Sequence, residues 1–305
     1  MSKILLLGKY GQVGWELQRT LASLGEVIAL DFPEIDVGDP KSIRNILQTT
    51  QPEVIINATA YNAVDQAEKE PEIAMRVNGR GPACLAEQAN KLEAALIHYS
   101  SDYVFDGSKG EPYTETDSPN PLNVYGRTKL LGEQAVQDGC EAYLIFRTSW
   151  VYSLRRECFV TKVLSWAKEQ DHLRIVTDQV SSPTWCRVLA EITAQTLAMG
   201  NRNIVSWIKE RKGAYHLSCR GSASRYEWAE AILKQAHNSN VEKRTKRIYP
   251  AVSADFSNPA ERPKYTVLNC QRFINTFGLH PPEWKEALQL AMEEGLDTLR
   301  YSTQG

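Results

Sequence analysis

Residues 3–14 read KILLLGKYGQVG, and this stretch decides the fold of the 305-residue chain. Its first five residues form an apolar run of the kind that a strand buried on both faces requires. Gly8, Gly11 and Gly14 follow, and an amphipathic pattern predicts a helix from Trp15 to Leu24. Glycines between a strand and a helix permit a tight turn, and the helix N-terminus favours an anion close to it. The stretch therefore predicts a pyrophosphate-binding loop, and a coincidental glycine-rich turn is the weaker interpretation.

A second apolar run, residues 27–30, predicts the next strand, and Asp31 follows it. A carboxylate at this place in a βαβ unit typically binds the adenosine ribose hydroxyls of a dinucleotide. Asp31 suits the 2′-hydroxyl of NADH, whereas Lys9 in the glycine loop can reach a 2′-phosphate. The residues therefore predict NADPH or NADH as cofactor and leave the choice between them open.

Helical and strand patterns alternate along the first half of the chain, with short connections between them. This alternation predicts an α/β fold, a Rossmann-type doubly wound parallel sheet whose ligands bind at the carboxyl ends of the strands. Beyond about residue 152 the alternation loosens. We expect residues 1–152 to form the dinucleotide-binding Rossmann domain, with some later segments returning to it. Residues 153–305 are expected to form mainly a smaller α/β substrate-binding lobe at the C-terminal side. The expected helices after the first are 43–48, 72–91, 125–136, 159–168, 187–199 and 224–235, and the further strands are 53–57, 95–99, 142–146, 173–176 and 213–218.

Composition and charge exclude several classes of protein. Hydrophobic residues make up 42% of the chain and charged residues 24%, which is ordinary for a soluble globular protein. A net charge of -2 provides no basic surface for nucleic acid. No apolar run approaches the ~20 residues that a membrane helix needs, and the N-terminus leads straight into a strand. We therefore expect no membrane association and a cytoplasmic location. The six scattered cysteines and five histidines show no metal-ligand spacing, so no metal site is predicted.

Tyr125 and Lys129 stand four residues apart at the start of an expected helix, which places them on the same face. An ammonium near a phenol favours the phenolate, lowers a pKa that starts near ~10, and prepares the phenol to pass a proton. The same spacing occurs by chance on many surface helices. Ser100 and Ser101 end the fourth expected strand, where a serine is more often a turn residue than a catalytic one. Together, the tyrosine, the lysine and a serine favour a carbonyl-reducing site.

In their order along the chain, the glycine loop, the strand-end serine and the Tyr-x-x-x-Lys pair resemble an extended short-chain dehydrogenase/reductase. Longer motifs resemble the dTDP-4-dehydrorhamnose reductase family more specifically, and they span nearly the full length. These motifs are GQVGWEL (11–17), AVDQAE (63–68), SDYVFDG (101–107), PLNVYG (121–126), RTSWVY (147–152), DQ (178–179), YHL (215–217), and RP (262–263) through LN (268–269).

The resemblance implies an NADPH- or NADH-dependent reduction of the 4-keto group of a dTDP-6-deoxy sugar to give dTDP-L-rhamnose. It implies that Tyr125 is the general acid, that Lys129 binds the nicotinamide ribose, and that Ser101 hydrogen-bonds the substrate carbonyl. Asp102 and Trp150 match positions that contact the sugar nucleotide. The positions expected to bind the cofactor, including the glycine loop, are Gly8, Gly11, Gln12, Val13, Gly14, Asp31, Asp36, Val37, Ala60, Tyr61, Asn62, Tyr99, Tyr125 and Lys129.

This chain departs from the family pattern in its second half. Residues 153–159 and 181–182 differ from the usual sequence, and Arg225 stands where Trp is frequent. Some members bind Mg²⁺ through glutamates at a dimer interface. Glu16 and Glu294 match that pattern, but Arg187 stands where a third glutamate is expected, which argues against Mg²⁺ here.

Two alternatives remain open from the sequence. One is a related nucleotide-sugar reductase or epimerase. The other is a non-catalytic dinucleotide-binding protein, like the regulatory subunit of methionine adenosyltransferase. The retained Ser101, Tyr125 and Lys129 favour an enzyme over the second alternative. The sequence also leaves open whether the chain forms a homodimer.

Overall fold

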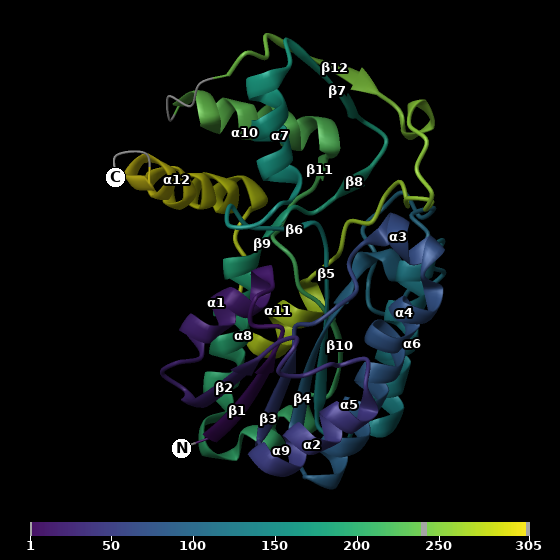
Figure 1. Cartoon of the computed structure of the whole chain (residues 1–305), viewed down its shortest axis with the longest axis vertical. Coiled ribbons are helices and arrows are strands. Elements are labelled where there is room, and N and C mark those ends of the chain that lie inside the picture. The colour runs from purple at the N-terminus through teal and green to yellow at the C-terminus, as the bar shows by residue number, and fades with distance from the viewer. Residues whose placement is uncertain (1, 239–242, 303–305) are drawn as a thin grey trace.

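A six-stranded parallel sheet forms the centre of the computed structural model, which describes residues 2–238 and 243–302 (Figure 1). The strand order is β10-β5-β4-β3-β1-β2, so the order reverses between β1 and β3. Such a reversal is the switch point at which doubly wound sheets bind ligands. The α/β fold class is thereby confirmed. The strands are β1 (Ser2–Leu7), β2 (Gly25–Leu30), β3 (Val54–Asn57), β4 (Ala95–Ser101), β5 (Tyr143–Thr148) and β10 (Gly213–His216).

Helices cover both faces of this sheet, and the alternation of side chains along β1 shows why. Ile4 and Leu6 pack into the core on one face, whereas Leu5 and Leu7 pack into the core on the other. Both sets are buried, which explains the uninterrupted apolar run in the sequence. The first face carries α1 (Gln12–Thr20), α8 (Cys186–Gly200), α9 (Ile204–Glu210) and α11 (Gln271–Phe277), and the second carries α2 (Pro40–Thr50), α5 (Gly81–Lys91) and α6 (Val124–Gly139).

The helix expected over residues 72–91 is interrupted by a π-helical turn, Arg76–Arg80. It separates α4 (Pro71–Met75) from α5, and α3 (Val64–Lys69) precedes them. Within the turn the buried Asn78 side chain accepts a hydrogen bond from the Tyr61 backbone N–H at 2.8 Å and donates to Thr128 of α6 at 3.2 Å. The turn thus ties the loop after β3 to α6, and π-turns are frequent near functional sites.

The remaining elements form a smaller lobe at the carboxyl edge of the sheet, drawn above the sheet in Figure 1. Some elements that follow residue 152 do not belong to this lobe and pack with the central sheet instead: β10, α8, α9 and α11. Among the helices in the described ranges, none combines the length and apolarity that crossing a membrane requires. The lobe contains α7 (Phe159–Glu169), α10 (Arg225–Asn238), α12 (Trp284–Ser302) and the strand pairs β6 (Val151–Tyr152) with β9 (Thr184–Trp185), β7 (His172–Val176) with β12 (Arg247–Ala251), and β8 (Val180–Ser181) with β11 (Ala223–Ser224).

Candidate active site

A cavity of ≈ 290 Å³ lies at the carboxyl ends of the central strands, and a second of ≈ 330 Å³ adjoins it. The two share Gly11, Ala58, Thr59, Ala60 and Asn62 on their walls. Of the residues expected from the sequence, the first cavity also brings together Gln12, Val13, Tyr99, Ser101, Asp102, Tyr125, Lys129 and Trp150. The second adds Gly8, Asp31, Asp36 and Val37. Of the site residues expected from the sequence, only Gly14 and Tyr61 lie on the wall of neither cavity.

The glycine loop can adopt its path only without side chains at two positions. Gly8 has a φ of +91°, which side chains strongly disfavour, and a Cβ on Gly14 would lie 1.9 Å from the Gly8 carbonyl oxygen. Gly14 therefore acts by allowing α1 to pack against the turn rather than by facing the cavity. The Oε1 atom of Gln12 is buried on the first cavity's wall and has no hydrogen-bond donor among the described residues. An unpaired acceptor at this place is consistent with a ligand that donates to it.

Asp31 on the wall of the second cavity and Lys9, the neighbour of Gly8 in the glycine loop, both already have partners. The Asp31 carboxylate accepts hydrogen bonds from the backbone N–H groups of Tyr10 at 3.0 Å and Phe32 at 2.8 Å. Lys9 forms an ion pair with Glu34 at 2.5 Å, and this contact raises the pKa of Lys9. The ammonium expected to reach a 2′-phosphate is therefore partly neutralised.

Tyr61 is turned away from both cavities. Its hydroxyl donates to the Glu70 carboxylate at 2.5 Å, and this contact raises the pKa of Tyr61 to about 12. Only the Tyr61 backbone, held by Asn78, follows the loop that lines the cavities. A contact from this residue to a dinucleotide would thus come from its main chain.

The start of α6 places Tyr125 in the first cavity. Asn123 caps the helix by accepting from the Gly126 N–H at 2.8 Å. A Cβ on Gly126 would lie 2.1 Å from the Tyr103 carbonyl oxygen, so the helix can approach the 3₁₀ turn after β4 only with glycine there. The rings of Tyr125 and Tyr103 meet edge to face at 5.8 Å. The phenol is therefore held rigidly beside Ser101 at the end of β4.

The electrostatics of the Tyr125–Lys129 pair differ from the sequence-based expectation. Burial raises the pKa of Tyr125, and the neighbouring Ser101 hydroxyl, rather than Lys129, opposes that shift. Lys129 is buried, its Nζ donates to the Tyr99 carbonyl oxygen at 2.6 Å, and burial lowers its pKa to about 8. Desolvation dominates the pKa of both groups in this arrangement, and the lowering of the phenol's pKa by Lys129 stays a prediction.

Asp102 links the sheet to the smaller lobe. Its buried carboxylate accepts hydrogen bonds from Thr266 at 2.5 Å, Ser181 at 3.2 Å and Ser101 at 3.1 Å. Burial raises the pKa of Asp102 to about 6, and these hydroxyls oppose the shift. Sequence reasoning did not identify Ser181 or Thr266 as site residues, because no local pattern connects them to a strand end so far away in the chain.

Trp150 also joins the two lobes. Its backbone φ is +43°, and its ring stacks on the buried Trp228 of α10 with the centroids 5.5 Å apart. The Arg225 guanidinium carbon lies 3.7 Å from the Trp150 centroid. Trp150 therefore forms a wall of the first cavity that is anchored from the smaller lobe.

Glu16, Arg187 and Glu294 line a separate cavity of ≈ 570 Å³ between α1, α8 and α12. Arg187 forms ion pairs with Glu294 at 3.0 Å and with Glu191 at 2.8 Å. In the described part of the chain, no group of three or more His, Cys, Asp or Glu side chains is arranged to hold a metal ion. These residues do not fit a Mg²⁺ site, because a guanidinium stands among the carboxylates that would have to bind the ion.

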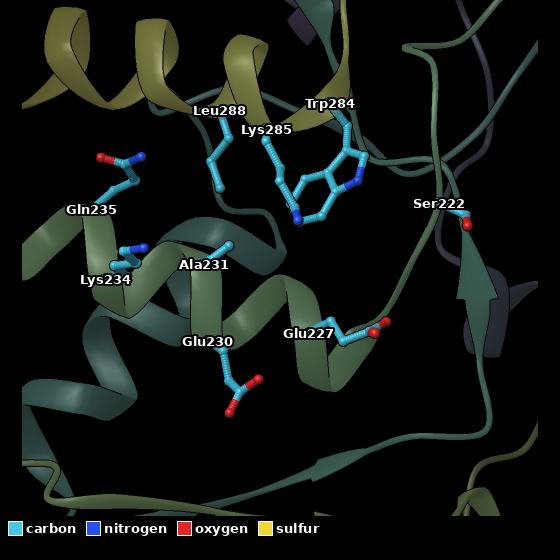
Figure 2. A pocket seen from close by; sticks show the side chains of 9 residues that line it. All are labelled: Ser222, Glu227, Glu230, Ala231, Lys234, Gln235, Trp284, Lys285 and Leu288. Atoms are coloured by element: carbon cyan, nitrogen blue, oxygen red, sulfur yellow. The ribbon is translucent and has the colours of Figure 1, made fainter.

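A further cavity of ≈ 360 Å³ lies between α10 and α12 (Figure 2). Figure 2 shows Glu227 and Glu230 on α10 and Lys285 on α12, with Trp284 at one end. None of the residues expected to bind cofactor or substrate lines it. The candidate active site is therefore the pair of adjoining cavities at the sheet edge.

Comparison with known proteins agrees with this geometry. The family profile described as the RmlD substrate binding domain matches residues 2–296. A dTDP-4-dehydrorhamnose reductase from Escherichia coli K12 is 39% identical over 296 residues, covering 95% of this chain and 97% of that protein. A crystal structure of a dTDP-4-dehydrorhamnose reductase from Clostridium acetobutylicum has a TM-score of 0.87 at 34% identity, covering 98% of this chain and 99% of that one. The Bacillus anthracis enzyme in complex with NADP has a TM-score of 0.85 at 32% identity, covering 96% and 99%. The chain therefore belongs to the dTDP-4-dehydrorhamnose reductase family.

Proposed function

We propose that this protein uses NADPH or NADH to reduce the 4-keto group of dTDP-4-dehydrorhamnose, giving dTDP-L-rhamnose. One observation carries the proposal. Tyr125, Ser101 and Asp102 share a cavity with the glycine loop, so a sugar carbonyl and a dinucleotide can meet there. The relatives named above favour this reaction over an epimerase or a non-catalytic binding protein.

The residues of the two cavities fit a dinucleotide. Gly8 and Gly11 line the second cavity beside the N-terminus of α1, where a pyrophosphate is favoured, and Asp31 on the same wall can bind a ribose. Gln12 offers an unpaired acceptor. The other residues proposed to contact the cofactor are Gly11, Val13, Asp36, Val37, Ala60, Tyr61, Asn62 and Tyr99. When bound, the reduced nicotinamide would supply the hydride that the reaction requires.

Tyr125 is proposed to donate the proton to the carbonyl oxygen as that oxygen gains charge. The raised pKa suits this role, because a proton donor must remain protonated at neutral pH. Ser101 would hydrogen-bond the same oxygen and hold it within reach of the phenol. Asp102 holds Ser101 in turn, through the 3.1 Å contact between their side chains.

Lys129 is proposed to act after the proton has moved. With a pKa of about 8 it remains mostly charged at neutral pH. One of its three N–H donors binds the Tyr99 carbonyl, and the others are free to bind the nicotinamide ribose. A buried cation near Tyr125 would stabilise the phenolate that proton donation leaves behind.

The direct test supplies the keto-sugar nucleotide with NADPH or NADH and follows the loss of reduced-nicotinamide absorbance. NMR of the product then distinguishes a reduced sugar from an epimerised one. Consumption of the cofactor with formation of dTDP-L-rhamnose is the expected result. A product that retains its keto group, or no consumption with either cofactor, would contradict the proposal.

Replacing Glu34 with glutamine should shift cofactor preference toward NADPH. The change removes the carboxylate that pairs with Lys9 and frees an ammonium beside the glycine loop for a 2′-phosphate. We expect kcat/KM for NADPH to rise about threefold to tenfold relative to that for NADH. Steady-state kinetics with both cofactors measures the ratio. The matched control is Glu72→Gln, which breaks an exposed ion pair with Arg80 away from the cavity; an equal shift in this control would contradict the role of Lys9.

Replacing Asp102 with asparagine should change how stability depends on pH. In the folded protein Asp102 keeps its proton up to about pH 6, against an ordinary pKa of 3.8. Between these values the folded state binds more protons than the unfolded state, so Asp102 makes the free energy of unfolding fall as pH rises. As pH rises from 4 to 6, the free energy of unfolding of Asp102→Asn should therefore increase relative to that of wild type by about 1–3 kcal/mol.

Urea unfolding at several pH values measures this difference. Asp106 provides a control whose pKa is shifted in the opposite direction. Hydrogen bonds, of which that from the Ser108 N–H has the largest effect, lower the pKa of Asp106 to about 2. The Asp106 carboxylate therefore adds to the free energy of unfolding above its ordinary pKa, and this stabilisation is lost as pH falls toward 2. Parallel stability curves for wild type and Asp102→Asn would show that Asp102 titrates normally.

A further inference from the structure

Arg225 is the first residue of α10, and its backbone is bound to the segment that carries Ser181, a partner of Asp102. Its N–H donates to the Gln179 carbonyl at 3.1 Å, and the preceding residue, Ser224, pairs with Val180 of β8. The next residue of β8 is Ser181, whose hydroxyl binds the Asp102 carboxylate. Arg225 is therefore connected through β8 and Ser181 to Asp102, which lines the first cavity.

The Arg225 guanidinium rests on aromatic rings rather than on a carboxylate. Its central carbon lies 3.7 Å from the ring centroid of Trp150, 4.8 Å from that of Phe159 and 5.4 Å from that of Trp228. Within residues 2–238 and 243–302 it has neither an ion pair nor a side-chain hydrogen bond, unlike Arg147 or Arg174. The side chain is thus oriented by stacking, while its five N–H donors remain unused.

The surroundings of the Arg225 guanidinium make its charge energetically unfavourable when no anionic ligand is bound. The side chain is partly buried, and burial lowers the pKa of Arg225 to about 10. Arg262 is close enough to oppose its charge, whereas Tyr103 and Asp102 favour it. Arg262 is itself held by Asp65 at 2.7 Å. The guanidinium of Arg225 therefore lacks the paired anion that a desolvated charge requires.

We propose that Arg225 binds the diphosphate of the nucleotide-sugar substrate. The planar guanidinium matches phosphate oxygens in pairs, and stacking on Trp150 fixes the plane in advance. Trp150 lines the cavity that also holds Tyr125, so a diphosphate on Arg225 places the attached sugar toward the proton donor. The inference rests on the proposed function and assigns a substrate-anchoring residue to it.

Binding of thymidine, dTMP and dTDP to the full-length protein, measured by calorimetry at saturating NADP⁺, tests this role separately from turnover. We expect Arg225→Gln to weaken dTDP binding about 10- to 100-fold and to leave thymidine binding unchanged, because only the phosphates lose a charged partner. Arg225→Lys should retain more dTDP affinity than Arg225→Gln. For the keto-sugar nucleotide, KM should rise far more than kcat falls.

The matched control is Arg174→Gln, which removes a guanidinium that also faces an aromatic ring, Phe256, but is already paired with Asp255. This control should bind dTDP like wild type. Equal dTDP affinity in wild type and Arg225→Gln would overturn the inference, and so would an equal loss for thymidine and dTDP, which indicates a structural role. Arg225-dependent dTDP binding in a protein that reduces no keto-sugar would instead contradict the proposed reaction and leave the subsite standing.

Discussion

Replacing Tyr125 with phenylalanine is expected to lower kcat for keto-sugar reduction by a factor of about 10²–10⁴. The variant keeps the ring that packs against Tyr103 and loses only the hydroxyl that is proposed to donate the proton. Because the ring remains in place, the affinity for the dinucleotide should change little. Single-turnover kinetics and cofactor titration measure the two quantities separately.

The control for this variant is Tyr103→Phe. Tyr103 lines the same cavity and contacts the Tyr125 ring, and burial raises the pKa of Tyr103 as it does that of Tyr125. It has no proposed part in proton transfer, so its loss of kcat should be much smaller than that of Tyr125→Phe. Unchanged turnover in Tyr125→Phe would remove Tyr125 as the acid, and similar losses in both variants would point to cavity polarity instead.

Replacing Glu133 with alanine is expected to destabilise the protein by about 3–5 kcal/mol. Glu133 and Arg147 form a buried pair, with the Arg147 Nε 3.0 Å from each carboxylate oxygen and Nη2 2.7 Å from one of them. The two side chains are 1% and 5% exposed, so removing the carboxylate leaves an uncompensated cation in the interior. Denaturant unfolding monitored by fluorescence and circular dichroism gives the change.

Two further variants separate the charge from the hydrogen bonds. Glu133→Gln retains an acceptor for Arg147 and should lose less stability than Glu133→Ala. Glu87→Ala removes an exposed carboxylate paired with Lys91 and should change stability far less than Glu133→Ala. A Glu133→Ala variant as stable as Glu87→Ala would show that Arg147 finds another partner or admits water.

The buried pair also bears on the proposed chemistry. Glu133 lies one helical turn after Lys129 on α6 and raises the pKa of that lysine against the effect of burial. Without Glu133, more of Lys129 would be neutral at neutral pH. Glu133→Gln, if folded, should therefore lower activity near neutral pH more than at pH values well below the pKa of Lys129.

The glycine loop, the parallel strands and the strand-end position of Ser101 could be predicted because each depends on neighbours in sequence. Apolar runs without alternation specify strands buried on both faces, and the carboxyl ends of such strands meet at one edge of the sheet. Ser101 ends β4 and Tyr125 lies in the first turn of α6, and both line the cavity at this edge of the sheet. The π-turn at Arg76–Arg80 escaped prediction because helical periodicity continues through it.

The sequence by itself thus determined the sheet and the loop after β1, and it predicted Ser101, Tyr125 and Lys129 as site residues, which the structure places on one cavity wall. The tertiary structure alone decided what surrounds them. Asp102 gains its partners Ser181 and Thr266, and Trp150 gains Arg225, from segments that no local pattern relates to the strand ends. The pKa values of Tyr125 and Lys129 followed burial rather than their spacing, because desolvation depends on every segment that packs around a group and not on its neighbours along the chain.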